Sequence, residues 1–167
     1  MDVRFFNPFI SAIQSVFKTT LKTEILISKP RVERKDEADA DVSAIIGFSG
    51  GAMGSVALCF PMKTAVAAAS KLTDTELHQD HPDFADALGE LANRVAGQAK
   101  AQLHGEQISI SVPSVAMGAA HCVLKSQRMP ALMLLCDSVL GRFSVRVTMT
   151  ANKNTNSQTP VRAVGRA

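Results

Sequence analysis

The stretch from Asp83 to Gln98 reads DFADALGELANRVAGQ, and its spacing predicts a long amphipathic helix. An α-helix turns by about 100° per residue, so the side chains of this segment separate into two stripes. The apolar stripe contains Phe84, Leu88, Leu91 and Val95, and the polar stripe contains Asp86, Glu90, Asn93 and Gly97. We therefore expect a helix from about Pro82 to about Leu103, with its apolar stripe on a core.

Segments on both sides of this helix predict a sheet and two further helices. Asn7-Pro8 is expected to open the first helix with Asn7 as its N-cap, and a second helix is expected from Met62 to Leu72. Strands are expected at 24–28, 42–48, 55–60, 108–112, 132–137 and 142–150, with another possible at 122–126 and an irregular segment at 115–120.

A weak internal repeat suggests how these elements are arranged. Both halves of the chain run helix, short strand and hairpin, and Ile45–Phe60 and Leu134–Met149 each place a glycine between two β-rich runs. We expect an α+β fold of two layers, a largely antiparallel sheet with helices packed on one face. Residues 1–150 should form a single domain, and residues 151–167 a polar, flexible tail.

The composition argues against several classes of protein. No run of about 18 apolar residues occurs, so we expect no membrane insertion. The start of the chain lacks the pattern of a secretory signal, which makes the cytoplasm the expected location. The net charge of +3 comes largely from the tail, and the chain has no Trp or Tyr. Nucleic-acid binding is therefore not expected.

The cysteines and histidines do not predict a metal site. Cys59, Cys122 and Cys136 form no CxxC pair and lie among apolar residues, so buried reduced thiols are expected. His78 and His81 lie close to two aspartates, which leaves a metal site as an alternative to a solvated loop before the helix. No further ligand group is evident in the sequence, so no metal ligands are assigned.

The polar stripe contains residues that helix stability alone would not favour. Gly89 and Gly97 each cost up to about 1 kcal/mol relative to Ala, and they flank Glu90 and Asn93. Asn93 is also a poor residue for the middle of a helix. The glycines would leave room for a partner to approach, or would allow close packing against another helix. Asp86 would assist docking, or would only stabilise the helix start.

At this point the chain resembles the CheC/CheX/FliY family of chemotaxis phosphatases. The spacing Asp86-x-x-x-Glu90-x-x-Asn93-x-x-x-Gly97 matches the family signature, and the opening MDVRFFNPF is similar to CheX. The resemblance extends over about residues 1–150. It implies a CheC-like fold and hydrolysis of the aspartyl phosphate on CheY-like response regulators. CheC-like members carry the Glu-x-x-Asn pair on two helices, but here the first helix has none, so one site per chain and a homodimer are implied, as in CheX.

The resemblance also implies a division of labour between the two site residues. Asn93 would orient the attacking water, because a neutral carboxamide both accepts and donates hydrogen bonds without repelling phosphoryl oxygens. Glu90 would pair with the receiver lysine, and Asp86, Gly89 and Gly97 would form the docking surface. The chain would need no cofactor of its own, since the expected Mg²⁺ belongs to the phosphorylated receiver. A non-catalytic adaptor that binds receivers, or a purely structural homodimer, is the alternative.

Overall fold

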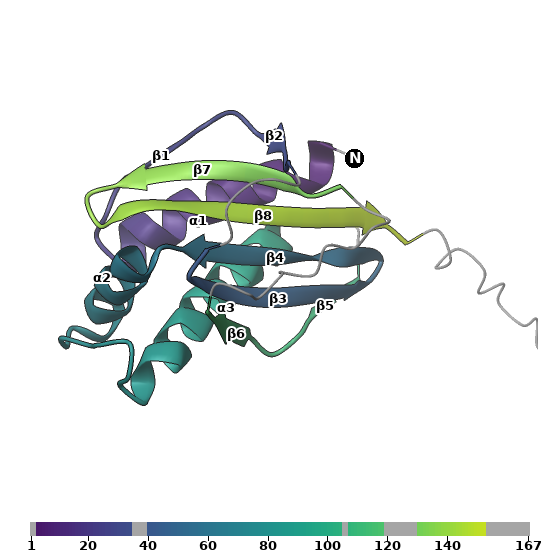
Figure 1. Cartoon of the computed structure of the whole chain (residues 1–167). Helices are drawn as coiled ribbons and strands as arrows, with labels where there is room; N and C mark the ends of the chain where they lie inside the picture. The colour runs from purple at the N-terminus through teal and green to yellow at the C-terminus, as the bar shows by residue number, and fades with distance from the viewer. Residues whose placement is uncertain (1–2, 35–39, 105–106, 119–129, 153–167) are drawn as a thin grey trace, which may run out of the picture.

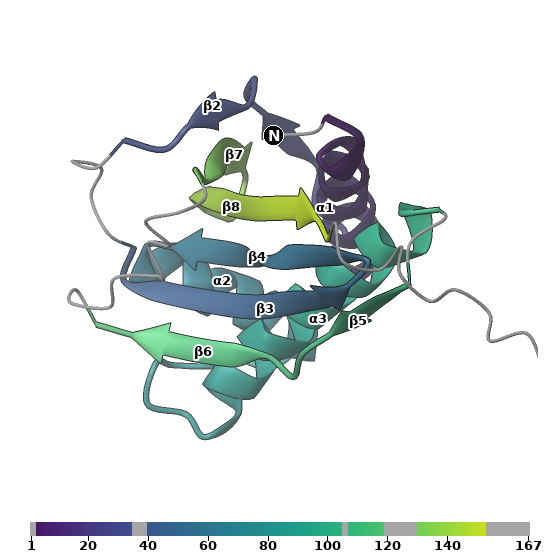
Figure 2. The same ribbon diagram turned by 90° about the vertical axis from the view of Figure 1, so that its right-hand side faces the viewer.

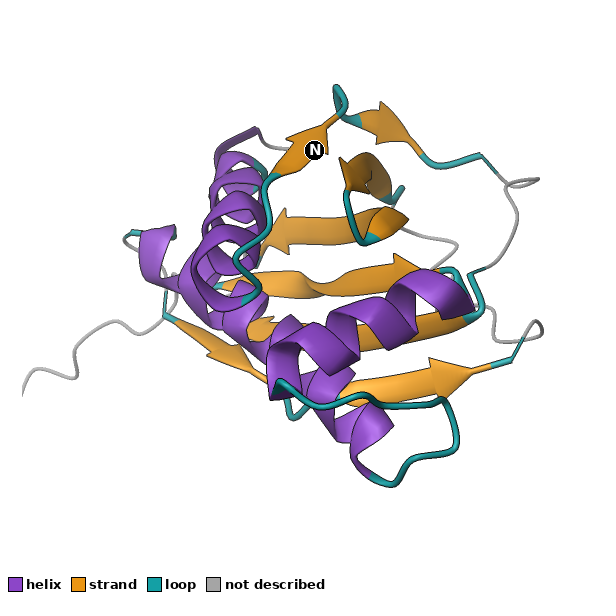
Figure 3. Ribbon diagram, turned by 90° about the vertical axis from the view of Figure 1, so that its left-hand side faces the viewer, coloured by secondary structure: helices purple, strands orange, loops and turns teal. Residues whose placement is uncertain are grey.

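A computed structural model describes residues 3–34, 40–104, 107–118 and 130–152 of the chain. In this part of the chain, three α-helices cover one face of an eight-stranded antiparallel sheet (Figures 1 and 3). The predicted architecture, a largely antiparallel sheet with helices on one face, is confirmed. The helices are α1 (Asn7–Thr20), α2 (Met62–Thr73) and α3 (Asp83–Gln102), preceded by a 3-10 turn, η1 (Val3–Phe5). The strands are β1 (Ile25–Ile27), β2 (Arg31–Val32), β3 (Val42–Gly50), β4 (Ala52–Phe60), β5 (Ile108–Ile110), β6 (Ser114–Met117), β7 (Leu132–Ser138) and β8 (Gly141–Ala151).

The order of the strands explains the internal repeat. The sheet runs β1-β7-β8-β4-β3-β5, with β2 also paired to β7 and β6 also paired to β3. The strands of the two halves correspond in pairs: β1 to β5, β2 to β6, β3 to β7 and β4 to β8. Replacing each strand by its counterpart gives the same strand order read from the other edge of the sheet. Each half therefore lends its short strands to the hairpin of the other half. The central pairing of β4 with β8, in which Val56 faces Val147, joins the halves into one sheet.

The core lies between the sheet and the helices. Alternate residues of the central strands point toward the helical layer and are almost fully buried. Phe143 of β8 stacks on Phe17 of α1 with a ring separation of 4.8 Å, and Phe9 packs edge-on against Phe48 of β3 at 5.5 Å. These contacts fix α1 and the sheet relative to each other. In Figure 2, α2 and α3 lie behind β3 and β4, and α1 lies to the right of β8.

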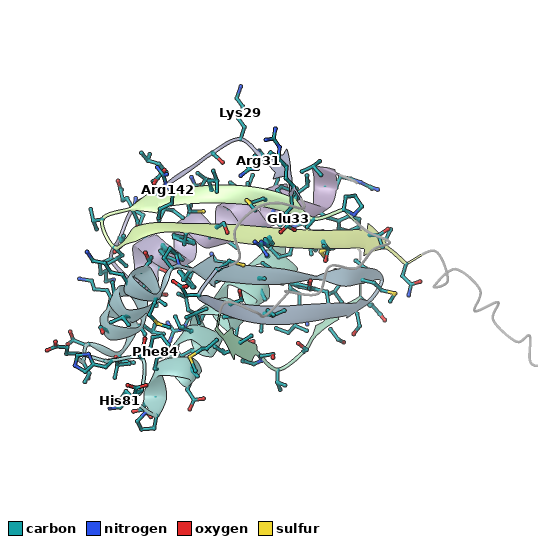
Figure 4. All side chains as sticks on the ribbon, in the orientation of Figure 1. Lys29, Arg31, Glu33, His81, Phe84 and Arg142 are labelled. Atoms are coloured by element: carbon teal, nitrogen blue, oxygen red, sulfur yellow. The ribbon has the colours of Figure 1, made fainter. Side chains whose placement is uncertain are left out.

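The sheet face away from the helices contains a largely buried ion pair. Arg146 of β8 and Glu33, just after β2, approach to 3.2 Å between Nε and Oε1, with side chains only 6% and 13% exposed. Figure 4 places Glu33 over β8, whereas Lys29 points outward from the same edge of the molecule. The pair ties the β2 edge to the centre of the sheet.

Several details differ from the sequence predictions. The N-cap of α1 is Phe6 rather than Asn7, which is the first helical residue, and no side chain caps the helix. Residues 115–117 of the segment expected to be irregular at 115–120 belong to strand β6, because they pair with residues 42–44 of β3. The possible strand at 122–126 and residues 153–167 of the expected tail lie outside the described residues.

Two of the three cysteines are described, and both are buried as expected. Cys59 on β4 and Cys136 on β7 are free thiols. Burial raises the pKa of the Cys136 thiol to about 12, and the neighbouring Asp137 carboxylate adds to the shift. No helix in the described part of the chain combines the length and apolar character that a membrane span needs.

Candidate functional site

The long helix α3 is oriented as its sequence predicts. Phe84, Leu88, Leu91 and Val95 have no exposed surface and face the sheet and the other helices. Four fully buried side chains over three turns hold the helix at a fixed rotation, since turning it would expose apolar area at about 25 cal/mol per Å². The opposite stripe therefore faces solvent, and it presents Asp86, Glu90 and Asn93 as exposed residues.

Asn93 and Asp86 offer free polar groups at this surface. Among the residues that the structure describes, neither side chain has a hydrogen-bond or ion-pair partner within the chain. The Asn93 carboxamide thus keeps one acceptor and two donor hydrogens for an external molecule. Asp86 lies in the first turn of α3, where an acid also favours the helix dipole, so both interpretations of this residue still hold.

Glu90 already has an ion-pair partner within the chain, which was not among the predicted site residues. Arg94, four residues further along α3, donates to Glu90 Oε1 from Nε at 3.1 Å and from Nη2. The third guanidinium nitrogen, Nη1, lies 3.4 Å from Oγ1 of Thr20 at the end of α1. The four-residue spacing between an acid and Arg is a signal that could have predicted the ion pair, but only the fold brings Thr20 to it.

The polar stripe is flanked on one side by α1 and on the other by β6. On the α1 side, Gln98 Nε2 donates to Ser15 Oγ at 2.7 Å, one turn beyond Arg94. On the β6 side, Gly89 is buried, and a Cβ there would lie 3.2 Å from Cβ of Pro113 and 3.6 Å from Cγ2 of Val115. The polar stripe of α3 is therefore supported by α1 on one side and by β6 with the preceding Pro113 on the other.

The two glycines that flank Glu90 and Asn93 have different surroundings. We expected both Gly89 and Gly97 at the docking surface, with helix packing as the alternative. The contact with Pro113 gives Gly89 a packing role, although its partner is the segment before β6 and not a helix. A Cβ on Gly97 would meet no atom of the described chain within 4 Å, so this position stays open to a partner.

The equivalent helix of the first half offers no second acid–amide pair. The outward positions Ser11 and Gln14 of α1 are exposed, while Ala12 and Ile13 between them are buried in the core. Ser15 is used internally by Gln98. The geometry thus leaves one Glu-x-x-Asn pair on the helical layer of the described chain.

The loop before α3 contributes a hydrogen-bond acceptor to the start of the helix. The backbone N–H of Asp83 donates to Nδ1 of His81 at 3.1 Å, so the imidazole satisfies one of the free N–H groups at the helix start. Figure 4 shows His81 at this outer end of α3, away from the sheet, with Phe84 directed back toward the core. Within the described residues, no three His, Cys, Asp or Glu side chains are grouped closely enough to hold a metal ion.

Comparison with known proteins identifies the family. Residues 42–137 match the family model described as chemotaxis phosphatase CheX. No curated protein sequence matches the chain. Among solved structures, a putative chemotaxis protein from Desulfovibrio vulgaris Hildenborough is 32% identical, with 87% of this chain and 96% of that chain covered and a TM-score of 0.74.

Two further solved structures resemble the chain over a similar span. A chemotaxis protein CheX from Desulfovibrio desulfuricans is 28% identical over 87% of this chain and 99% of its own, with a TM-score of 0.79. CheX in a CheX–CheY–BeF3–Mg²⁺ complex from Borrelia burgdorferi is 25% identical over 87% of this chain and 97% of its own, with a TM-score of 0.73. Since the family model covers more than half of the sequence, this chain belongs to the CheX family of chemotaxis phosphatases.

Proposed function

We propose that this protein hydrolyses the aspartyl phosphate of a CheY-like receiver domain, with Asn93 and Glu90 as the residues that act on the substrate. The observation that carries the proposal is the exposed carboxamide of Asn93, which has no partner in the described chain and lies one helical turn from Glu90 on a helix fixed by four buried side chains. The family of chemotaxis phosphatases, and a CheX relative solved with CheY, support this substrate class.

Catalysis of acyl-phosphate hydrolysis depends mainly on positioning the attacking water and on electrostatic stabilisation, and the enzyme need not form a covalent bond to the substrate. Water attacks phosphorus in line with the leaving aspartate oxygen, through a loose transition state. Asn93 accepts a hydrogen bond from that water through its carbonyl oxygen. This bond orients the water so that a lone pair of the water oxygen points at phosphorus. Its amide hydrogens are free to donate to a phosphoryl oxygen. A carboxylate at this position would instead repel the phosphoryl group.

Glu90 sets the register between the two proteins. Its carboxylate pairs with the lysine that receiver domains hold near their phosphoaspartate, and this contact brings Asn93 to the phosphorus. The Mg²⁺ ion belongs to the receiver and arrives with it, so this chain supplies no metal ligand. Gly97, with open space above it, lets the receiver surface approach α3 closely, and Asp86 lies within reach of the same surface.

The test compares loss of phosphoaspartate from a phosphorylated CheY-like receiver, with Mg²⁺, in the presence and absence of the protein. We expect acceleration by the wild type and none by Asn93→Ala. Gln14→Ala, which removes an exposed carboxamide from the outer face of α1, is the matched control and should keep full activity. Acceleration that survives Asn93→Ala would refute the role of this residue. A wild type that binds the receiver without accelerating hydrolysis would identify a non-catalytic adaptor instead.

Two further expectations accompany this proposal. A cytoplasmic location follows from the substrate class, and a homodimer follows from the resemblance to members with one site per chain. Light scattering after size-exclusion chromatography would test the second expectation, because a monomeric mass at micromolar concentration contradicts it.

A further inference from the structure

The guanidinium of Arg94 connects Glu90 on α3 with Thr20 on α1. It lies beside Glu90 on α3, with Nε and Nη2 both directed at one carboxylate oxygen, Oε1. Nη1 is directed away from Glu90, toward Thr20 Oγ1 at the end of α1. Both charged side chains remain about half exposed, at 47% for Arg94 and 54% for Glu90. The pair is therefore at the surface where a partner would dock, and not part of the core.

The geometry leaves half of the carboxylate open. Arg94 occupies Oε1, and no residue of the described chain makes a hydrogen bond to Oε2 of Glu90. A carboxylate has lone pairs on both oxygens and accepts from two cations at once. An incoming lysine ammonium thus has an acceptor available without displacing Arg94.

The bond to Thr20 makes the arrangement more than a local helix pair. An exposed Glu–Arg pair four residues apart is weak and its side chains stay mobile. Here the planar guanidinium contacts two helices, and its three nitrogens have fixed relative directions. Holding Arg94 against α1 therefore restricts the side-chain torsions of Glu90 before any partner arrives.

From this arrangement we infer that Arg94 is a positioning residue, which orders the Glu90 carboxylate so that Oε2 faces the lysine of the receiver. The inference rests on the proposed function, since it concerns the same docking event. Binding that must immobilise a long, flexible side chain loses conformational entropy, and this loss weakens the affinity. A side chain that is already ordered in the free protein avoids most of this entropy loss. Arg94 acts through Glu90 and does not touch the phosphoryl group.

The experiment measures hydrolysis across a range of phosphorylated receiver concentrations for Arg94→Gln. We expect KM to rise about threefold to tenfold, the range for ordering one long side chain, with kcat within about twofold of wild type. Arg94→Lys keeps the charge but loses the two-nitrogen contact and the reach to Thr20, so its KM should lie between those of wild type and Arg94→Gln. Thr20→Val should raise KM in the same direction by a smaller factor.

The matched control is the same substitution in a Glu90→Gln background. If Arg94 acts through the carboxylate, Arg94→Gln should change KM no further once the carboxylate is gone. An unchanged KM in the single variant, a fall in kcat with KM constant, or an equal effect in both backgrounds would each overturn the inference. A lower KM would also overturn it, because it would mean that Arg94 competes with the lysine.

A binding measurement separates this inference from the proposed function. Titration calorimetry with a receiver activated by beryllofluoride and Mg²⁺ reports docking without turnover. A wild type that binds but does not hydrolyse refutes the phosphatase proposal alone, and the Kd of Arg94→Gln then decides the role of Arg94: a threefold to tenfold rise supports it, and no change overturns it. A wild type that does neither overturns both.

Discussion

Replacing Gly97 and Gly89 separately by Ala tests whether the two glycines have different roles. Both lie inside α3, so each replacement removes the excess backbone freedom of glycine and favours the helix by about 0.5–1 kcal/mol. For Gly97 nothing opposes this gain, because its new Cβ would meet no atom of the described chain within 4 Å. We expect Gly97→Ala to raise Tm by about 1–4 °C, at about 2–4 °C per kcal/mol for a domain of this size.

At Gly89 the same gain is opposed by a steric contact. The new Cβ would lie 3.2 and 3.3 Å from Cβ and Cγ of Pro113, closer than the roughly 3.5–4.0 Å of a relaxed carbon contact. Overpacking of this kind costs about 1–3 kcal/mol. The net expectation is a change between zero and a loss of about 2.5 kcal/mol, so Gly89→Ala should melt below Gly97→Ala by several degrees.

Thermal melting followed by circular dichroism, with urea unfolding as a second measure, checks both values. If Gly89→Ala gained as much stability as Gly97→Ala, Pro113 would have moved aside at no cost, and the packing argument would fail. Receiver dephosphorylation gives the second readout. Gly97→Ala should lose about tenfold in kcat/KM while being more stable, because its methyl group stands between α3 and the docked receiver; full activity would refute the docking role of Gly97.

Three further predictions concern stability. Gly141 has φ +125° in the β7–β8 hairpin and a Cβ there would overlap Oγ1 of Thr64, so Gly141→Ala should lose about 1–3 kcal/mol in urea unfolding; an unchanged midpoint would contradict this. Phe143→Ala should lose about 3–5 kcal/mol, because Phe143 is buried and stacked on Phe17; a loss below 1 kcal/mol would contradict the packing described. The raised pKa of Cys136 means that the unfolded thiol ionises first, so its contribution to stability is complete below pH 9.0 and is lost as the pH rises toward about 12. The stability of the wild type should therefore fall more steeply above pH 9 than that of Cys136→Ala, and equal slopes would count against the buried thiol.

Much of the fold could be predicted because its signals are local. The apolar spacing of α1 and α3 and the alternation along the two long hairpins determine which residues face the core, and the structure buries them. Strand β6 could not be predicted, because Val115 and Ala116 become a strand only through pairing with Ala44 and Ser43, more than 70 positions earlier in the sequence. The N-terminus of α1 was misplaced because Phe6, a residue with no capping side chain, precedes the helix.

The candidate site also has features that the sequence predicts and features that only the fold determines. The outward position of Glu90 and Asn93 follows from helical spacing alone, so the sequence predicts that they share a surface. What surrounds them does not follow from spacing. The contact of Gly89 with Pro113 and the reach of Arg94 to Thr20 depend on which elements the fold places beside α3. The sequence therefore predicts which residues are presented, and the tertiary structure determines how firmly they are held.

The duplicated architecture explains how one helix comes to be held so firmly. The exchange of halves makes α1 the counterpart of α3, yet α1 presents no acid–amide pair and instead supplies Ser15 and Thr20 as contacts for Gln98 and Arg94. Catalysis that depends on positioning loses about a hundredfold for a displacement of about 1 Å. A single exposed helix could not meet that tolerance, but α3 is fixed by its buried stripe against the sheet and flanked by α1. In this chain, the first helix thus supports the site that its counterpart carries.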